Sequence, residues 1–109
     1  MKVIQDVYVG KKAKEKQEQI LRNIRKHKPQ SGVYCISLAK NGCDLLEIYH
    51  NNLLLQPFYK NSDKMIVGIA VGYEEAIEVV TEIVEEMYHK TGKFDIQTYI
   101  SSGKNFESN

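Results

Sequence analysis

The residues most able to perform chemistry in this 109-residue chain are two cysteines and three histidines. Cys35 and Cys43 give no disulfide framework, and no pair among the cysteines and histidines has the spacing of a zinc motif. A Cys43–His50 or a Cys35–His89 pair could join a nucleophile to its base, because such partners meet in space rather than in sequence. Free cysteines on strands are more often small buried hydrophobic residues, and we adopt that interpretation. We expect His27 and His89 to be solvated near helix ends.

Two glycines lie where a predicted strand meets a predicted helix, a place where backbone N–H groups can bind phosphate. The dinucleotide fingerprint needs three glycines in register, and the P-loop needs Lys followed by Ser or Thr; neither pattern is present. Glu74 and Glu75, which follow, would repel an anion. We therefore assign Gly68 to close packing and Gly72 to a turn, and predict no cofactor.

Carboxylates are abundant between residues 73 and 91, which hold six glutamates. A metal site or an acid–base pair would need partners that converge from another element. Five of the six recur at steps of three, four and seven residues and are predicted to form an outward, solvated stripe: Glu75, Glu78, Glu82, Glu85 and Glu86. No catalytic residue or metal ligand is assigned, so the sequence favours a non-enzymatic protein.

The N-terminal third predicts a strand and then a helix. Lys2 to Val9 is rich in β-branched residues and ends at Gly10. Residues 11–28 change to helical spacing, with a narrow apolar stripe made by Ala13, Gln17, Ile20, Leu21 and Ile24. Basic residues before Pro29 mark the helix end, whereas Lys11 and Lys12 are unfavourable in its first turn.

The middle of the chain predicts a hairpin. Val33 to Lys40 alternates like a strand, and Asn41-Gly42 is the preferred pair for a type I′ turn. The partner strand is Cys43 to His50, with a short helix as the alternative, because Leu45, Leu46, Ile48 and Tyr49 also fit a helical face.

Further along, Leu53 to Tyr59 is apolar but contains Pro57, which predicts an edge strand or an irregular crossing. Met65 to Val71 is apolar throughout, as in a central strand. Tyr73 to Thr91 is the best-defined helix; its predicted core residues are Ala76, Ile77, Val80, Ile83, Val84 and Met87. Phe94 to Ile100 is predicted to add a short strand.

This order of elements predicts an α+β fold. We expect a two-layer sandwich, an antiparallel-rich sheet of four or five strands with the helices 11–28 and 73–91 on one face. Residues 1–100 would form a single domain, followed by a polar tail over residues 101–109.

Composition narrows the classes of function. Hydrophobic residues make up 42% of the chain and charged residues 27%, which is typical of globular proteins. The net charge of +1 predicts neither a nucleic-acid nor a membrane partner. The start lacks a secretory signal, and residues 65–73 are far short of the ~20 needed to cross a bilayer. We expect a cytoplasmic protein with reduced thiols.

Charge divides unequally between the two predicted helices. Residues 11–28 hold eight basic and two acidic residues, a net +6, and residues 73–91 hold six glutamates and one lysine, a net −5. Three explanations compete: attraction between neighbouring helices within one subunit, attraction between copies, or binding of the basic helix to a phosphate backbone.

These observations favour a protein-interaction domain that forms a homodimer or another homo-oligomer, or binds another protein. Its candidate surface combines the basic helix with the 53–59 segment: Lys12, Lys16, Arg22, Arg25, Leu53, Leu55, Phe58 and Tyr59. The alternative is a nucleic-acid-binding accessory protein that uses Lys11, Lys12, Lys16, Arg22, Arg25 and Lys28. Against it, the basic helix has no interleaved aromatic residue, no nucleic-acid-binding motif is present, and an adjacent acidic helix would repel a polyanion.

Overall fold

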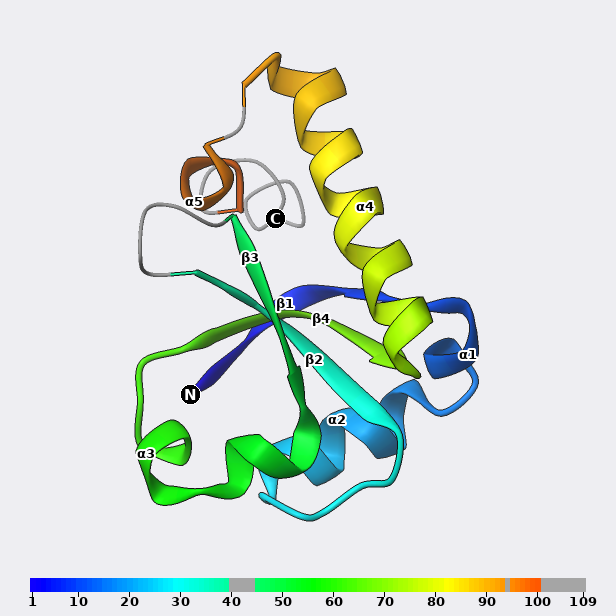
Figure 1. Ribbon diagram of the computed structural model, residues 1–109, viewed down its shortest axis with the longest axis vertical. Helices are drawn as coiled ribbons and strands as arrows, with labels where there is room; N and C mark the ends of the chain where they lie inside the picture. The colour runs from blue at the N-terminus through cyan, green and yellow to red at the C-terminus, as the bar shows by residue number, and fades with distance from the viewer. Residues whose placement is uncertain (40–44, 94, 101–109) are drawn as a thin grey trace.

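The computed structural model describes residues 1–39, 45–93 and 95–100, which form a four-stranded sheet with helices packed on it (Figure 1). The strands are β1 (Lys2–Val9), β2 (Val33–Leu38), β3 (Leu46–His50) and β4 (Met65–Val71). The helices are α1 (Lys11–Lys14), α2 (Gln17–Arg25), the 3-10 helix η1 (Asn51–Leu55), α3 (Pro57–Lys60), α4 (Tyr73–Thr91) and α5 (Ile96–Tyr99).

The sheet has the strand order β1-β4-β2-β3. β1 runs parallel to β4, whereas β2 runs antiparallel to both of its neighbours, so the predicted α+β fold with an antiparallel-rich sheet is confirmed. β3 is a strand rather than the alternative helix; it pairs with β2 from Tyr34 opposite His50 to Leu38 opposite Leu46. The predicted Asn41-Gly42 turn lies outside the described residues.

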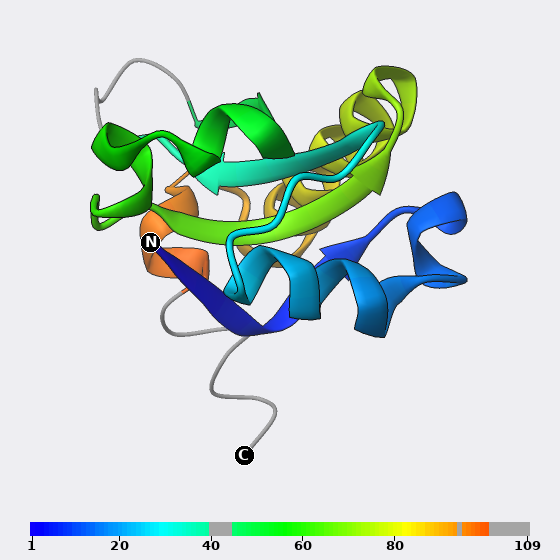
Figure 2. The same ribbon diagram turned by 90° about the horizontal axis from the view of Figure 1, so that it is seen from below.

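The helices do not share one face of the sheet, in contrast to the predicted arrangement. Ile36 of β2 belongs to a hydrophobic cluster with Ile83 of α4, whereas its neighbour Cys35 belongs to a second cluster with Ile20 and Ile24 of α2. Because successive strand side chains point to opposite faces, α4 and α2 cover opposite sides, and the sheet is the middle of three layers (Figures 1 and 2). The physical reason is that β2 and β4 are apolar on both faces, so each face needs its own cover.

Two glycines have the predicted structural roles. A Cβ atom on Gly68 would lie 3.1 Å from Cγ1 of Val79, so α4 packs closely on β4 at this point. Gly72 has a φ of +92° at the N-terminus of α4, a conformation that L side chains rarely adopt.

The predicted helix 11–28 is two helices, α1 and α2, separated at Glu15 and Lys16. α1 has no side-chain cap and carries only basic residues near its positive end, so little in its own sequence stabilises it. α2 ends at Arg25, three residues before the predicted end, and the chain leaves the helix through His27 in a left-handed conformation with a φ of 56°. The N–H of Lys28 donates to the carbonyl of Asn23 (2.9 Å), as in a Schellman motif.

The segment 53–59 is an irregular crossing built from two short helices, so its alternative assignment as an edge strand is wrong. Pro57 is the first residue of α3. The N–H groups of a helix's first turn form no hydrogen bond within the helix, so proline, which lacks an N–H group, is tolerated there.

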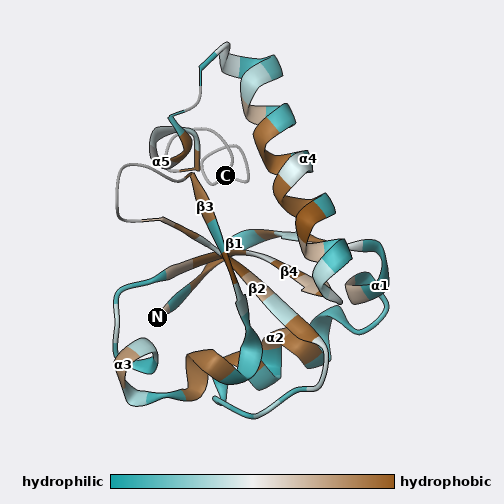
Figure 3. Ribbon diagram, viewed as in Figure 1, coloured by the Kyte–Doolittle hydropathy of each residue, from teal (hydrophilic) through white to brown (hydrophobic). Residues whose placement is uncertain are grey.

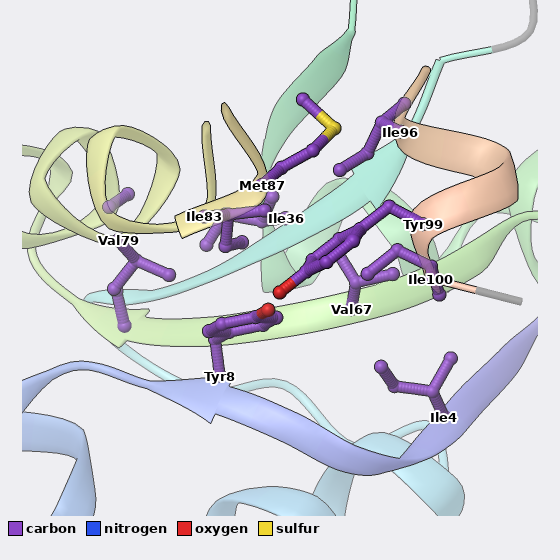
Figure 4. Packing of buried hydrophobic residues seen from close by; sticks show 12 residues of the cluster. Ile4, Tyr8, Ile36, Val67, Val79, Ile83, Met87, Ile96, Tyr99 and Ile100 are labelled. Carbon is purple, nitrogen blue, oxygen red and sulfur yellow. The ribbon is translucent and has the colours of Figure 1, made fainter. Parts of the chain in front are cut away.

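The strand predicted over 94–100 is instead the helix α5. Asp95 explains the difference, because its carboxylate accepts hydrogen bonds from the N–H (3.3 Å) and the hydroxyl (2.8 Å) of Thr98 and so caps the helix start. Buried apolar side chains of α5 and of the residue that follows it then pack in one cluster with Ile4 and Val67 (Figure 4): Ile96, Tyr99 and Ile100.

Candidate interaction surfaces

The basic surface lies on the outer side of α1 and α2. Ile20 and Ile24 bury one side of α2 against the sheet, and Arg22, two positions from each, points away from it. All eight basic residues of segment 11–28 are exposed, including the predicted contact residues Lys12, Lys16, Arg22 and Arg25. Among the described residues, none of the eight forms an ion pair, so the net +6 charge faces solvent.

The 53–59 part of the predicted surface divides in two. Leu53 and Phe58 are exposed, Phe58 with 79% of its surface, and both remain available for contact. Leu55 and Tyr59 are half-buried, and the Tyr59 ring packs against Tyr49 with centroids 5.5 Å apart. Leu53 and Phe58 are therefore the stronger candidates of the four.

A polar network holds this segment on the same side of the sheet as α2. The amide of Gln30 donates to the carbonyl of Ile20 (3.3 Å) and to Oδ1 of Asn51 (3.1 Å). The amide of Asn51 donates in turn to the carbonyl of Lys28 (3.0 Å). Leu54 shares the buried cluster of α2, so the two parts of the predicted surface lie on one side of the sheet.

Lys64, for which the sequence predicted no role, is buried rather than part of the basic surface. Its Nζ lies 3.3 Å from Oε1 of Glu47 and 4.4 Å from the centroid of the Tyr49 ring. Burial disfavours its charge, but hydrogen bonds to Tyr49 and Glu47 and their charges prevail and raise the pKa of Lys64. Lys64 thus ties β4 to β3.

Glu75 departs from the predicted solvated stripe of α4, because it is only 6% exposed. One carboxylate oxygen accepts from the N–H of Lys12 (2.5 Å) and the other from the N–H of Val71 (2.6 Å). A carboxylate thus satisfies a free N–H group at the start of α1, a helix whose own sequence offers no cap.

Glu86 is also engaged within the protein. Oε1 of Glu86 accepts a hydrogen bond from the hydroxyl of Tyr99 (2.7 Å) and lies 3.4 Å from Nζ of Lys90. The hydroxyl groups of Tyr8 and Tyr99 point toward one another in the core (Figure 4). Burial, and then the nearby Glu86, raise the pKa of both phenols. The exposed acidic residues of α4 are therefore Glu74, Glu78, Glu82 and Glu85.

One flank of α4 also exposes large apolar side chains that were not predicted from the sequence. Tyr73, Ile77 and Tyr88 are each about half exposed, although Ile77 was predicted to be in the core. Figure 3 shows hydrophobic segments recurring along α4 between hydrophilic ones. The sequence does contain a signal for this flank. Tyr73, Ile77 and Tyr88 recur along one side of the helix, next to the side formed by the buried residues Ala76, Val79, Ile83 and Met87.

The candidate nucleophiles do not assemble with a base among the described residues. Cys35 is fully buried, and desolvation raises its pKa to about 12, which makes it a poor nucleophile. His89 lies on α4, across the sheet from Cys35, and Nδ1 of His50 accepts from the N–H of Asn52 (3.0 Å). Cys43 is outside the described residues. Within those residues, no three His, Cys, Asp or Glu side chains are grouped to hold a metal ion.

His27 differs from the expected solvated imidazole, because it is half-buried and its Nδ1 has no hydrogen-bond partner within the described part of the chain.

In the described residues, no helix combines the length and apolar character needed to cross a membrane. Comparison of the chain with protein-family models, with curated proteins and with solved structures finds no match.

Proposed function

We propose that the chain is a small, non-enzymatic protein-interaction domain that binds further copies of itself. The observation that carries this proposal is the exposed apolar flank of α4, where Tyr73, Ile77 and Tyr88 follow one side of a single helix. Scattered exposed apolar residues are ordinary, but a row of them beside charged residues is typical of an interface. Leu53 and Phe58 add exposed apolar surface next to Leu54 and Tyr59, which belong to the cluster on the opposite side of the sheet.

The charges of the helices support contact between copies rather than within one. α2 and α4 lie on opposite faces of the sheet, so their outward charges do not meet in a single molecule. Attraction between the two helices of one subunit, one of the three explanations of the charge division, therefore loses its basis. Attraction between the basic side of one copy and the acidic side of another remains.

Sedimentation over a concentration series tests the proposal. We expect the mean mass to rise between about 1 μM and about 1 mM, the range in which weak protein contacts form. Ile77→Ser should lower the mass at a given concentration, whereas the control Gln5→Ser, at an exposed position of β1 outside both charged segments, should not. A wild-type chain that stays monomeric over the whole range would refute the proposal.

A second candidate, a nucleic-acid-binding accessory protein, is favoured by one observation. The acidic helix α4 lies across the sheet from α2, which weakens the objection that an adjacent acidic helix would repel a polyanion. The ring of Phe58 contacts Tyr59, which belongs to the cluster of α2, so an aromatic residue is available on the basic side and the objection that none is present is weaker too. Retention on a polyanion should then fall with salt and disappear in Arg22→Glu/Arg25→Glu. Lys2→Glu/Lys93→Glu, which makes the same charge change at exposed positions outside segment 11–28, is the control.

The proposal places the domain in the cytoplasm, where the buried thiol of Cys35 would stay reduced.

A further inference from the structure

A shallow hollow on α2 has basic residues at its rim. It is lined by Glu18, Leu21, Arg22, Arg25 and Lys26, and we call it the basic hollow. Leu21 is half-buried and packs on the cluster beneath the sheet, so an apolar side chain contributes to the floor. Arg22 and Arg25 are three positions apart on the outer side of the helix, which places them one above the other.

A second shallow hollow, on α4, has acidic residues at its rim. It is lined by Ile77, Glu78, Thr81, Glu82, Glu85 and Glu86, and we call it the acidic hollow. Ile77 is 46% exposed and gives this hollow an apolar surface. Glu85 lies two positions from the buried Ile83 and Met87, so it points away from the sheet.

The two hollows complement one another in charge and in pattern. Glu82 and Glu85 are three positions apart, as are Arg22 and Arg25. We infer that the basic hollow of one copy docks on the acidic hollow of the next copy, with Ile77 against Leu21. This inference rests on the proposed self-association and names its surfaces. The charged rims would set orientation and the association rate, and the apolar contact would supply much of the affinity.

The positions of the hollows determine what such a contact builds. They lie on helices that cover opposite faces of the sheet, so one docked pair leaves a basic hollow free at one end and an acidic hollow free at the other (Figure 1). A contact between two different surfaces is heterologous, and it repeats until a ring closes or continues as an open chain. The assembly therefore grows beyond a dimer.

Paired charge-reversal variants test this arrangement. Arg22→Glu/Arg25→Glu gives a copy with two acidic sides, and Glu82→Lys/Glu85→Lys gives a copy with two basic sides; all four positions are exposed. Each variant alone should associate about 100-fold more weakly than the wild type, because like charges would face one another. An equimolar mixture should recover the wild-type mass distribution. Lys2→Glu/Lys93→Glu, which reverses two exposed charges elsewhere, should behave as the wild type.

Light scattering on each variant, the mixture and the wild type reads out the result, and far-ultraviolet circular dichroism confirms that each variant is folded. Recovery of mass on mixing supports the arrangement. A reversal variant that associates on its own as strongly as the wild type, or a mixture that stays monomeric, overturns the arrangement while leaving self-association standing. A wild-type chain that is itself monomeric refutes the proposed function as well.

Discussion

At the scale of single residues, Glu75 shows what a sequence pattern can conceal. It occupies a regular place among six glutamates of α4, yet it is buried while Glu78 and Glu82 are exposed. Its hydrogen-bond partner Lys12 lies 63 positions away in the sequence, and a Cβ on Gly10 would come within 2.6 Å of its carboxylate. No local periodicity encodes such a contact, which depends on how β1 and β4 bring α1 beside α4.

Glu75→Gln should lower the free energy of unfolding by about 1–3 kcal/mol. The substitution turns one acceptor into a donor, so the N–H of Lys12 or of Val71 loses its partner. Urea unfolding of the variant measures the effect, and Glu78→Gln, on the same helix but exposed, should change stability little. Equal effects of the two substitutions would show that the buried carboxylate does not have this role.

The tyrosine pair predicts a loss of stability at alkaline pH. The pKa values of Tyr8 and Tyr99 are raised above their ordinary value of 10.0, chiefly by burial. A raised folded-state pKa gives stability that is complete below the unfolded-state pKa and is lost as pH rises toward the folded-state value. The raised pKa values of Cys35 and Lys64 act in the same direction.

The free energy of unfolding should therefore decline above about pH 9–10. In Tyr8→Phe, which keeps the ring but cannot ionise, the decline should be shallower, whereas Tyr88→Phe on the exposed flank of α4 should leave it unchanged. Denaturant titrations at intervals between neutral and strongly alkaline pH provide the measurement. Identical slopes in the wild type and Tyr8→Phe would contradict the assignment.

At the scale of elements, the long periodic segments could be predicted and the short ones could not. The β-branched run of β1, the apolar run of β4 and the three- and four-residue steps of α4 each correspond to a described element. α3 and α5 have only four residues each, too few to show a period. Their helical state depends on Pro57 at the first position and on the Asp95 cap, which are local signals that apolar patterning does not include.

The end of α2 offers a prediction about backbone conformation. His27 has a φ of 56°, which is unfavourable for an L side chain, and its Nδ1 is buried without a partner among the described residues. His27→Gly should raise the free energy of unfolding by about 1 kcal/mol. Gln19→Gly, at an exposed position inside α2, should lower it by about 0.5–1 kcal/mol. Thermal unfolding of His27→Gly and Gln19→Gly provides the measurement. A loss of stability in both variants would show that the left-handed backbone at His27 is not unfavourable.

At the scale of the whole molecule, the two-sided burial of the central strands decides the architecture. The apolar run Met65 to Val71 is typical of a strand covered on both faces, and Cys35 and Ile36 are both fully buried on opposite sides of β2. The number of helices alone suggested two layers. The burial pattern of β2 and β4 instead requires cover on each face, and this separates the basic helix α2 from the acidic helix α4.

This separation also limits what the sequence could say about the candidate surfaces. The charges of residues 11–28 and 73–91 could be counted from the sequence, but their opposite placement depends on the sheet between them. The exposed residues Arg22, Arg25 and Phe58 were identified from the sequence, whereas Tyr73, Ile77 and Tyr88 were not. A core residue and its exposed neighbour on an apolar helix differ only in their angle around the axis, and the position of the sheet sets that angle.

Head-to-tail association through the oppositely charged sides can be measured by light scattering after size exclusion, at low and at high salt. If oppositely charged sides of successive copies attract one another, the wild-type mass should exceed that of a dimer at low salt and high concentration, and should fall as salt screens the charges. A strictly dimeric mass at both salts would indicate a closed, apolar interface and contradict head-to-tail docking. A monomer at both salts would contradict self-association itself.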